Sequence, residues 1–251
     1  MPSGDFDYDA HGHDYATIRR PDPRIASLVH SALGDARTVL NVGAGAGSYE
    51  PSDRPVVALE PSATMRAQRP PSSPPAVAGS AEQLPFDDKS FDAVMATVTV
   101  HQWHELDRGL AEIRRVARGP VVILTFDGDA LDRFWLAAYA PELIAAERRR
   151  YPAIPLLANA IGRSSSVTEV PVPIDCVDGF TEAFYARPEG FLDQRVRAAQ
   201  SAWGFITPEA TQRAVANLRQ DLASGRWDQT YAEWRTQPHF NGSLRLITGH
   251  P

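Results

Sequence analysis

The chain has 251 residues, which is long enough to bury a substantial core as one large domain or as one domain with an insertion. Its apolar content of 43% and charged content of 22% are ordinary for a folded protein and exclude disorder as the starting expectation. The net charge of −6 argues against a nucleic-acid partner, and the single cysteine, Cys176, excludes an intramolecular disulfide.

The first half of the chain alternates apolar strands with amphipathic helices. A polar and aromatic segment, 1–20, precedes a helix that begins at Asp22-Pro23 and stops at Gly34. Further helices are predicted from Ser62 to Gln68 and over 106–118, and strands over 37–42, 55–60, 76–79, 91–98 and 121–126. Apolar strands between amphipathic helices indicate a parallel sheet covered on both faces, wound by right-handed crossovers into a doubly wound α/β core.

The second half is less regular. The pattern predicts a helix over 130–150 that ends in three solvated arginines at 148–150. A β-like run over 167–174 is interrupted by prolines and should lie near a sheet edge, and 244–248 forms a last strand. Between these strands, helical patterns cover 187–203, 208–224 and 227–235. We therefore expect a core of residues 1–174 and 238–251, with an N-terminal cap, and a helical lid over 175–237 inserted between the last two strands.

Glycines and a carboxylate follow the first two strands. The strand at 37–42 runs into Gly43, Gly45 and Gly47, and the strand at 55–60 ends at Glu60. In a parallel sheet these residues converge on one edge, where they form the usual site for an adenosine-bearing ligand. A nicotinamide-dependent oxidoreductase is one alternative. The G-x-G-x-G spacing and the absence of an evident Tyr-x-x-x-Lys pair count against it.

Three segments in order resemble a known family. Val-Leu-Asn-Val-Gly-Ala-Gly-Ala-Gly at 39–47 resembles the first motif of class I S-adenosylmethionine-dependent methyltransferases, and Glu60-Pro61-Ser62 matches their acidic strand end. Residues 79–92 closely resemble the G-D-A-E-x-L-P-F-x-D-x-S-F-D signature of the small-molecule branch, called UbiE-like or type 11. The resemblance implies a Rossmann-like sheet of seven strands, one of them antiparallel. It also implies S-adenosyl-L-methionine as cofactor and S-adenosyl-L-homocysteine as product.

The resemblance also implies roles for individual residues. The glycine turn would lie against the methionine part of the cofactor, and Glu60 would accept hydrogen bonds from both ribose hydroxyls. Met65 would pack on the adenine, while Tyr15 and Arg19 would close over the carboxylate. The cofactor-binding set implied in this way is Tyr15, Arg19, Asn41, Gly43, Ala44, Gly45, Gly47, Glu60, Pro61, Met65, Ser80, Ala81, Glu82, Thr97 and Val98.

Two positions depart from the family pattern. Asn41 stands where an acid is usual and supplies no charge for the cofactor's ammonium group, and Ser80 replaces an aspartate near the adenine. These departures leave open a second alternative, a catalytically weak relative that binds the cofactor without turnover.

The acceptor side is predicted from the ends of later strands. His101 follows the strand at 91–98 and is the candidate general base, since histidine pKa values lie near neutrality; a purely lining role is the alternative. The predicted substrate pocket comprises His101, Trp103, Phe126, Trp135 and Tyr139, and no metal is expected.

Taken together, these patterns predict methyl transfer by in-line displacement to a small-molecule or modified-peptide acceptor, with oxygen favoured over carbon and nitrogen. An apolar, lidded pocket and a role in specialised metabolism are expected. With a polar N-terminus and no apolar run of about 18 residues, we expect a cytoplasmic monomer or homodimer without nucleic-acid or membrane partners.

Overall fold

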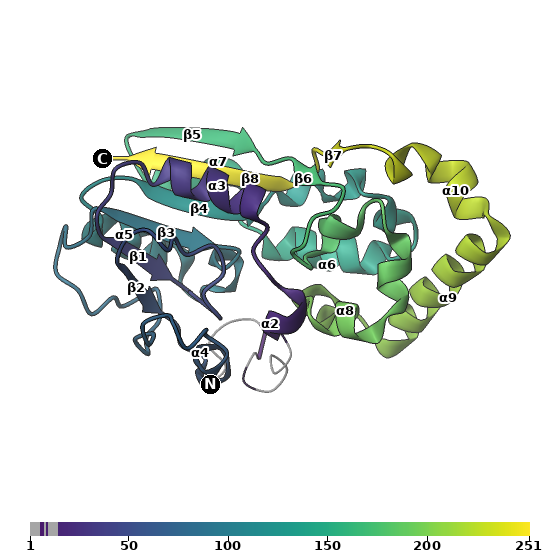
Figure 1. Cartoon of the computed structure of the whole chain (residues 1–251), viewed down its shortest axis with the longest axis horizontal. Coiled ribbons are helices and arrows are strands. Elements are labelled where there is room, and N and C mark those ends of the chain that lie inside the picture. Colours follow the sequence, from purple (N-terminus) through teal and green to yellow (C-terminus); the bar gives the residue numbers. More distant parts are fainter. Residues whose placement is uncertain (1–5, 8, 10–14) are drawn as a thin grey trace.

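The computed structural model describes residues 6, 7, 9 and 15–251, and its centre is a six-stranded sheet (Figure 1). The strands lie in the order β2-β1-β3-β4-β8-β5. Their bounds are β1 Val39–Val42, β2 Val56–Leu59, β3 Ala93–Thr97, β4 Val121–Phe126, β5 Ser164–Glu169 and β8 Leu244–His250. Neighbours among β1 to β4 are parallel, and β8 runs antiparallel to both β4 and β5. The predicted Rossmann-like α/β class with one antiparallel strand is confirmed.

The seventh strand expected at 76–79 is reduced to a single bridge between Leu59 and Val77. Four prolines precede it at positions 70, 71, 74 and 75. Proline has no backbone N–H to donate to a neighbouring strand, so the ladder cannot extend from Val77 back through positions 74 and 75. The sheet therefore has one strand fewer than the resemblance implies.

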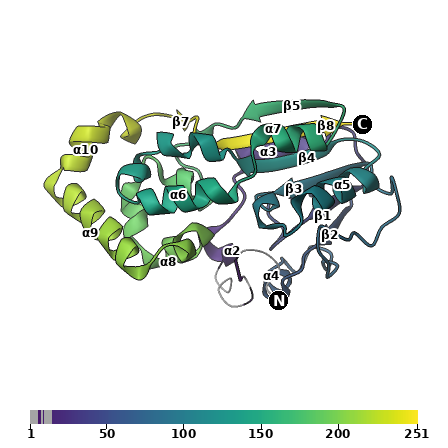
Figure 2. The ribbon, with the colours of Figure 1, turned by 180° about the vertical axis from the view of Figure 1, so that it is seen from behind.

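Helices cover both faces of the sheet. In Figure 1, α3 (Pro23–Ala32) lies on the near face, and Figure 2 shows α5 (Leu106–Val116) and α7 (Ile154–Ala160) on the opposite face. The start of α3 is fixed by Asp22, whose carboxylate accepts a hydrogen bond from the Arg24 backbone N–H at 3.0 Å. The short helices α2 (Tyr15–Ile18), α4 (Ala63–Ala67) and η1 (Val100–Gln102) lie beyond the strand ends. Among the described residues, no helix is both long and apolar enough to cross a bilayer.

The single helix predicted over 130–150 is divided into three. They are η2 (Gly128–Arg133), η3 (Trp135–Ala138) and α6 (Pro141–Arg150). Pro141 begins α6 because proline is tolerated only in the first turn of a helix. The expectation of three solvated arginines at its end is also corrected. The side chain of Arg150 is 7% exposed and forms an ion pair with Glu147.

Residues 175–237 form a layer of helices beside the sheet (Figures 1 and 2). This inserted segment lies between β6 (Val172–Pro173) and β7 (His239–Phe240), which pair with each other. It contains η4 Thr181–Phe184, η5 Pro188–Leu192, α8 Gln194–Ala198, η6 Ser201–Phe205, α9 Pro208–Ser224, α10 Arg226–Tyr231 and η7 Ala232–Arg235. Thr207 caps the start of α9, and Gly225, with φ of 75°, ends it.

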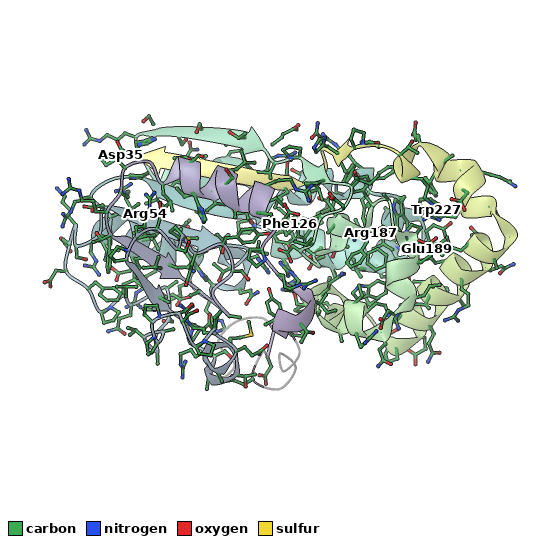
Figure 3. The ribbon with its side chains drawn as sticks, in the orientation of Figure 1. Asp35, Arg54, Phe126, Arg187, Glu189 and Trp227 are labelled. Atoms are coloured by element: carbon green, nitrogen blue, oxygen red, sulfur yellow. The ribbon has the colours of Figure 1, made fainter. Side chains whose placement is uncertain are left out.

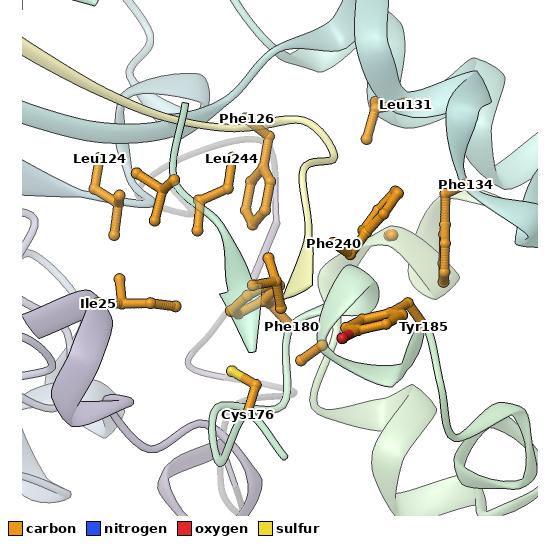
Figure 4. Packing of buried hydrophobic residues seen from close by; sticks show 14 of the residues in the cluster. Ile25, Leu124, Phe126, Leu131, Phe134, Cys176, Phe180, Tyr185, Phe240 and Leu244 are labelled. Carbon is orange, nitrogen blue, oxygen red and sulfur yellow. The ribbon is translucent and has the colours of Figure 1, made fainter. Parts of the chain in front are cut away.

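Aromatic side chains join the inserted segment to the sheet. Figure 4 shows Phe126 at the end of β4 beside Phe180, with Tyr185 and Phe240 beyond them. Trp227 is fully buried within the helical layer, some way from Phe126 in Figure 3. Burial of side chains of this size is a large favourable term, so the helical layer and the sheet share one core.

Candidate active site

The glycine turn follows β1 directly. Gly43, Gly45 and Gly47 have φ values of 68°, 52° and 93°, which residues with a side chain rarely adopt. A Cβ atom on Gly43 would lie 2.1 Å from Oγ1 of Thr99, in the segment that follows β3. The absence of a side chain at Gly43 therefore lets the turn lie directly against the end of a neighbouring strand.

Replacing Gly43 with alanine tests this close approach. Gly34 offers a matched control, because its φ of 57° is similar but nothing lies within 4 Å of an added Cβ. Both alanine variants carry the left-handed backbone cost, and only Gly43→Ala also clashes. We expect Gly43→Ala to lower the free energy of unfolding by about 1–3 kcal/mol more than Gly34→Ala does, in urea denaturation. Equal losses would contradict this account of the turn.

Glu60 lies at the end of β2 and is 7% exposed. One carboxylate oxygen accepts a hydrogen bond from the Gly45 backbone N–H, and the other accepts one from Ser62, both at 2.8 Å. Burial raises the pKa of Glu60, while these two N–H groups and the nearby Arg66 oppose the rise. The carboxylate is thus held between the glycine turn and the start of α4, with further lone pairs available on both oxygens.

Asn41, which stands where the family usually has an acid, lies beside the carboxylate of Glu50. The Asn41 side-chain amide donates to Glu50 Oε1 at 3.0 Å, and Arg69 donates to both Glu50 oxygens at 2.9 and 2.8 Å. Oδ1 of Asn41 is buried and has no hydrogen-bond partner among the described residues. The buried Glu50–Arg69 pair has no signature in the sequence, because nineteen positions separate its members. It ties the glycine turn to the proline-rich segment that follows α4.

A pocket opens above the glycine turn, and we call it the turn cavity; its empty space, which includes open solvent at its mouth, is about 440 Å³. It is lined by Tyr15, Gly43, Ala44, Gly45, Ala46, Ser48, Glu60, Met65, Thr97, Val98, Thr99 and Gln102. Eight of these are in the implied cofactor set, and Ala46, Ser48, Thr99 and Gln102 are additional. The other implied residues, Arg19, Asn41, Gly47, Pro61, Ser80, Ala81 and Glu82, do not line it. Glu82 instead accepts hydrogen bonds from the backbone N–H groups of His104 and Glu105.

A second pocket adjoins the first, and we call it the side cavity; its empty space, which includes open solvent at its mouth, is about 490 Å³. Its lining residues are Tyr15, Arg19, Val98, His101, Gln102, Phe126, Leu131, Glu147, Tyr151, Phe180, Thr181, Glu182, Gln200, Ser201 and Ala202. The two cavities share Tyr15, Val98 and Gln102, so a ligand in one would lie next to a ligand in the other. Val98 has φ of 53°, a strained conformation for a β-branched residue, at the junction itself.

His101 is 8% exposed and lines the side cavity. Its Nδ1 atom has no hydrogen-bond partner among the described residues, and its Nε2 atom lies 3.3 Å from the side-chain nitrogen of Gln102. Burial lowers the pKa of His101 well below its ordinary value, and the charges of Arg150 and Arg19 lower it further. The imidazole is therefore neutral at neutral pH and has a nitrogen that can accept a proton.

The structure does not bring three of the predicted pocket residues to the side cavity. Trp103 packs against Gly109 of α5, where an added Cβ would lie 2.5 Å from the Trp103 ring. Trp135 is buried and donates its indole N–H to the Tyr185 carbonyl at 2.8 Å, and the Tyr139 hydroxyl donates to Asp221 at 2.9 Å. His101 and Phe126 do line the cavity.

The side chain of Asp178 joins three segments of the chain and is 2% exposed. One oxygen accepts a hydrogen bond from Nε of Arg19, and the other accepts one from the Tyr49 hydroxyl, both at 2.7 Å. Arg19 follows α2, Tyr49 ends the glycine turn, and Asp178 belongs to the inserted segment. A single carboxylate therefore links Arg19, in the wall of the side cavity, to Tyr49, which follows Ser48 of the turn cavity.

Comparisons with known proteins agree with this geometry. A type 11 family model, described as a methyltransferase domain, matches residues 40–123. Demethylmenaquinone methyltransferase of Thermobifida fusca is 46% identical over 52 residues, which cover 20% of this chain and only 22% of that protein. A solved structure from Anabaena variabilis, described as "Putative methyltransferase from antibiotic biosynthesis pathway", has a TM-score of 0.86 at 29% identity and covers 92% of this chain and 98% of its own.

A phosphoethanolamine N-methyltransferase of Haemonchus contortus, solved with S-adenosylhomocysteine, shares the fold at a TM-score of 0.56 and 14% identity. The match covers 96% of this chain and 57% of that one.

The turn cavity lies at the carboxyl ends of parallel strands, which is the usual place for an adenosine-bearing ligand in α/β sheets of this kind. Residues 40–123 match the methyltransferase-domain family model, and over 92% of its length the chain has the fold of the Anabaena protein, in agreement with the resemblance to class I S-adenosylmethionine-dependent methyltransferases. The cofactor that this resemblance implies is S-adenosyl-L-methionine. The residues of the turn cavity fit this cofactor, since Glu60 presents two fixed oxygens of the kind that a ribose diol requires.

Proposed function

We propose that the chain transfers a methyl group to a small molecule held in the side cavity, most readily to an oxygen atom. The observation that carries this proposal is the junction of the two cavities at Tyr15, Val98 and Gln102. The cofactor supplies an electrophilic methyl group and leaves as a neutral thioether. The protein must align the acceptor and exclude water, which for a well-oriented pair is worth up to about 7–11 kcal/mol of the barrier.

On the cofactor side, we propose that Glu60 accepts hydrogen bonds from the ribose hydroxyls and that the backbone of the glycine turn lies against the methionine part. Met65 and Tyr15 would line the same ligand. We further propose that the inserted segment at 175–237 acts as a lid on a core of residues 1–174 and 238–251. We also propose that the chain is a cytoplasmic enzyme of specialised metabolism and that it is active as a monomer or homodimer. The Anabaena protein, described as belonging to an antibiotic pathway, supports that setting.

His101 is proposed as the base that removes a proton from a hydroxyl acceptor. His101→Gln should lower kcat by about ten- to a hundredfold, near the lower end of what a positioned base contributes, and leave the affinity for S-adenosylhomocysteine unchanged. The pH profile of the wild-type enzyme should lose activity only below about 6.5, because the folded protein lowers the pKa of this imidazole. Labelled methyl transfer measures kcat and the pH profile. The control is His239→Gln, which changes an exposed strand residue. Unchanged turnover would remove His101 as the base.

Ligand-induced stabilisation tests the function as a whole. A ligand that binds the native state at a hundred times its Kd stabilises it by about 2.7 kcal/mol. We expect a rise in melting temperature with S-adenosylhomocysteine and none with NAD(H) or NADP(H). Stabilisation by a nicotinamide cofactor alone would refute the proposal. Stabilisation without labelled methyl transfer to any small-molecule acceptor would favour the weak cofactor-binding relative suggested by Asn41 and Ser80.

A further inference from the structure

Arg19 is a buried guanidinium in the wall of the side cavity. Its side chain is 10% exposed, and its Nε atom is hydrogen-bonded to Asp178. A guanidinium carries five N–H donors, and the two terminal amino groups of Arg19 form no hydrogen bond with any residue that the structure describes. Arg19 therefore presents unused donors to whatever occupies the side cavity.

The acidic groups of the same wall are already engaged. Glu147 forms an ion pair with Arg150 and accepts a hydrogen bond from the Tyr151 hydroxyl at 3.0 Å. Both oxygens of Glu182 accept from the Ser243 backbone N–H at 3.0 Å, and burial raises the pKa of Glu182 to about 7. These two carboxylates are thus turned toward protein partners. Their proximity still disfavours a doubly charged anion in the cavity.

The remaining free groups define what an occupant must offer. They are the terminal amino groups of Arg19 and Nδ1 of His101, in a wall that also carries the rings of Phe126 and Phe180. A planar guanidinium fork matches the two oxygens of a carboxylate, and the nearby Glu147 and Glu182 favour a monoanion over a phosphate monoester. On the proposed methyl-transfer function, we infer that the acceptor is a small hydroxy acid whose carboxylate binds Arg19 while its hydroxyl lies at His101.

A role for Arg19 on the cofactor carboxylate is the competing assignment. Arg19 lines the side cavity and does not line the turn cavity, whereas Tyr15 lines both. The placement of the guanidinium thus favours the acceptor. Arg19 is then a residue that determines acceptor specificity, and Tyr15 is the one of the two that contacts the cofactor.

Matched acceptor pairs test the inference. Labelled transfer is measured with the three monohydroxybenzoates and with their methyl esters, which keep the ring and hydroxyl but lose the charge. We expect kcat/KM for the best acid to exceed that of its ester at least tenfold, and Arg19→Lys, which keeps the charge next to Asp178, to reduce this ratio severalfold. Arg195→Gln, on an exposed side chain, is the control and should leave the ratio unchanged.

Three outcomes would overturn the inference. They are esters that react as well as acids, a ratio that Arg19→Lys leaves unchanged, and calorimetry that detects no binding of any hydroxybenzoate, at millimolar concentration, to the complex with S-adenosylhomocysteine. Transfer to uncharged acceptors alone would refute the hydroxy acid and leave the proposed function standing. If the wild type does not bind S-adenosylhomocysteine at all, the proposed function itself is refuted.

A cofactor fragment separates the two assignments of Arg19. 5′-Methylthioadenosine keeps the adenosine and thioether of the product but lacks its amino-acid carboxylate. We expect Arg19→Gln to leave the ratio of affinities for S-adenosylhomocysteine and 5′-methylthioadenosine within about threefold of the wild type, since each tenfold would require 1.4 kcal/mol of selective contact. A selective loss of S-adenosylhomocysteine affinity would place Arg19 on the cofactor. Melting temperatures show whether the variant remains folded.

Discussion

Replacing Asp178 with alanine is expected to lower the free energy of unfolding by about 3–5 kcal/mol, the usual cost of removing one partner from a buried ion pair. Burial alone would lower the pKa of Arg19, but Asp178 holds it above its ordinary value, so the guanidinium stays charged. Burial and the same carboxylate raise the pKa of Tyr49, whose hydroxyl remains a donor. Asp178→Ala would leave both groups buried without their acceptor. Chemical denaturation measures the loss directly.

Asp175 provides the matched control for this variant. It lies three positions earlier, its side chain is 73% exposed, and it pairs with Arg24 at the surface. Asp175→Ala should change the free energy of unfolding by no more than about 1 kcal/mol. Asp178→Asn, which keeps an acceptor oxygen but no charge, should lie between the two. Similar unfolding midpoints for Asp175→Ala and Asp178→Ala would contradict the structural role of this carboxylate.

The second large effect is expected at Glu60. Glu60→Ala should weaken the binding of S-adenosylhomocysteine by a hundredfold or more, because two hydrogen bonds to a charged acceptor are worth about 3–6 kcal/mol together. The same change removes the acceptor that holds the N–H groups of Gly45 and Ser62, which adds disorder of the glycine turn to the loss. Isothermal calorimetry on the purified chain measures the affinity.

Two further variants make the Glu60 result specific. Glu60→Gln keeps one acceptor oxygen and should lose less affinity than Glu60→Ala. Glu105→Ala removes a carboxylate that is 64% exposed and pairs only loosely with Arg108 at 3.6 Å, and it should bind as the wild type does. Full affinity in Glu60→Ala would refute the ribose assignment.

The sheet could be predicted from sequence because its strands are short apolar runs with unambiguous ends. The structure has β1 to β4 within two residues of the predicted bounds. Prediction failed where proline decided the outcome. The strand at 76–79 is a single bridge, and the long helix over 130–150 is interrupted before Pro141. The hydrophobic patterns at 76–79 and 130–150 are present, but hydrophobicity does not show where a proline removes a backbone N–H.

The two cavities differ in how much of them a sequence can reveal. Most of the turn cavity comes from three short segments, at 43–48, 60–65 and 97–102, and the glycines and the acid of the first two form a recognisable motif. The side cavity combines Arg19 with Glu182 and Gln200, residues more than 160 positions away, and no local pattern links them. Aromatic residues are equally suited to a core and to a pocket wall, which is why Trp135 was assigned to the pocket and lies in the core instead.

The bridge at Val77 closes one edge of the sheet, beside β2. Val77 uses its backbone N–H on Ala58 and its carbonyl on Glu60, so the outermost position of the sheet is already satisfied. The prolines before it offer no ladder that a second chain could extend. Parallel sheets fold slowly because their contacts are distant in sequence, and a partly folded chain exposes its edges for longer. At this edge of the sheet, beside β2, we therefore expect little strand-to-strand association between chains.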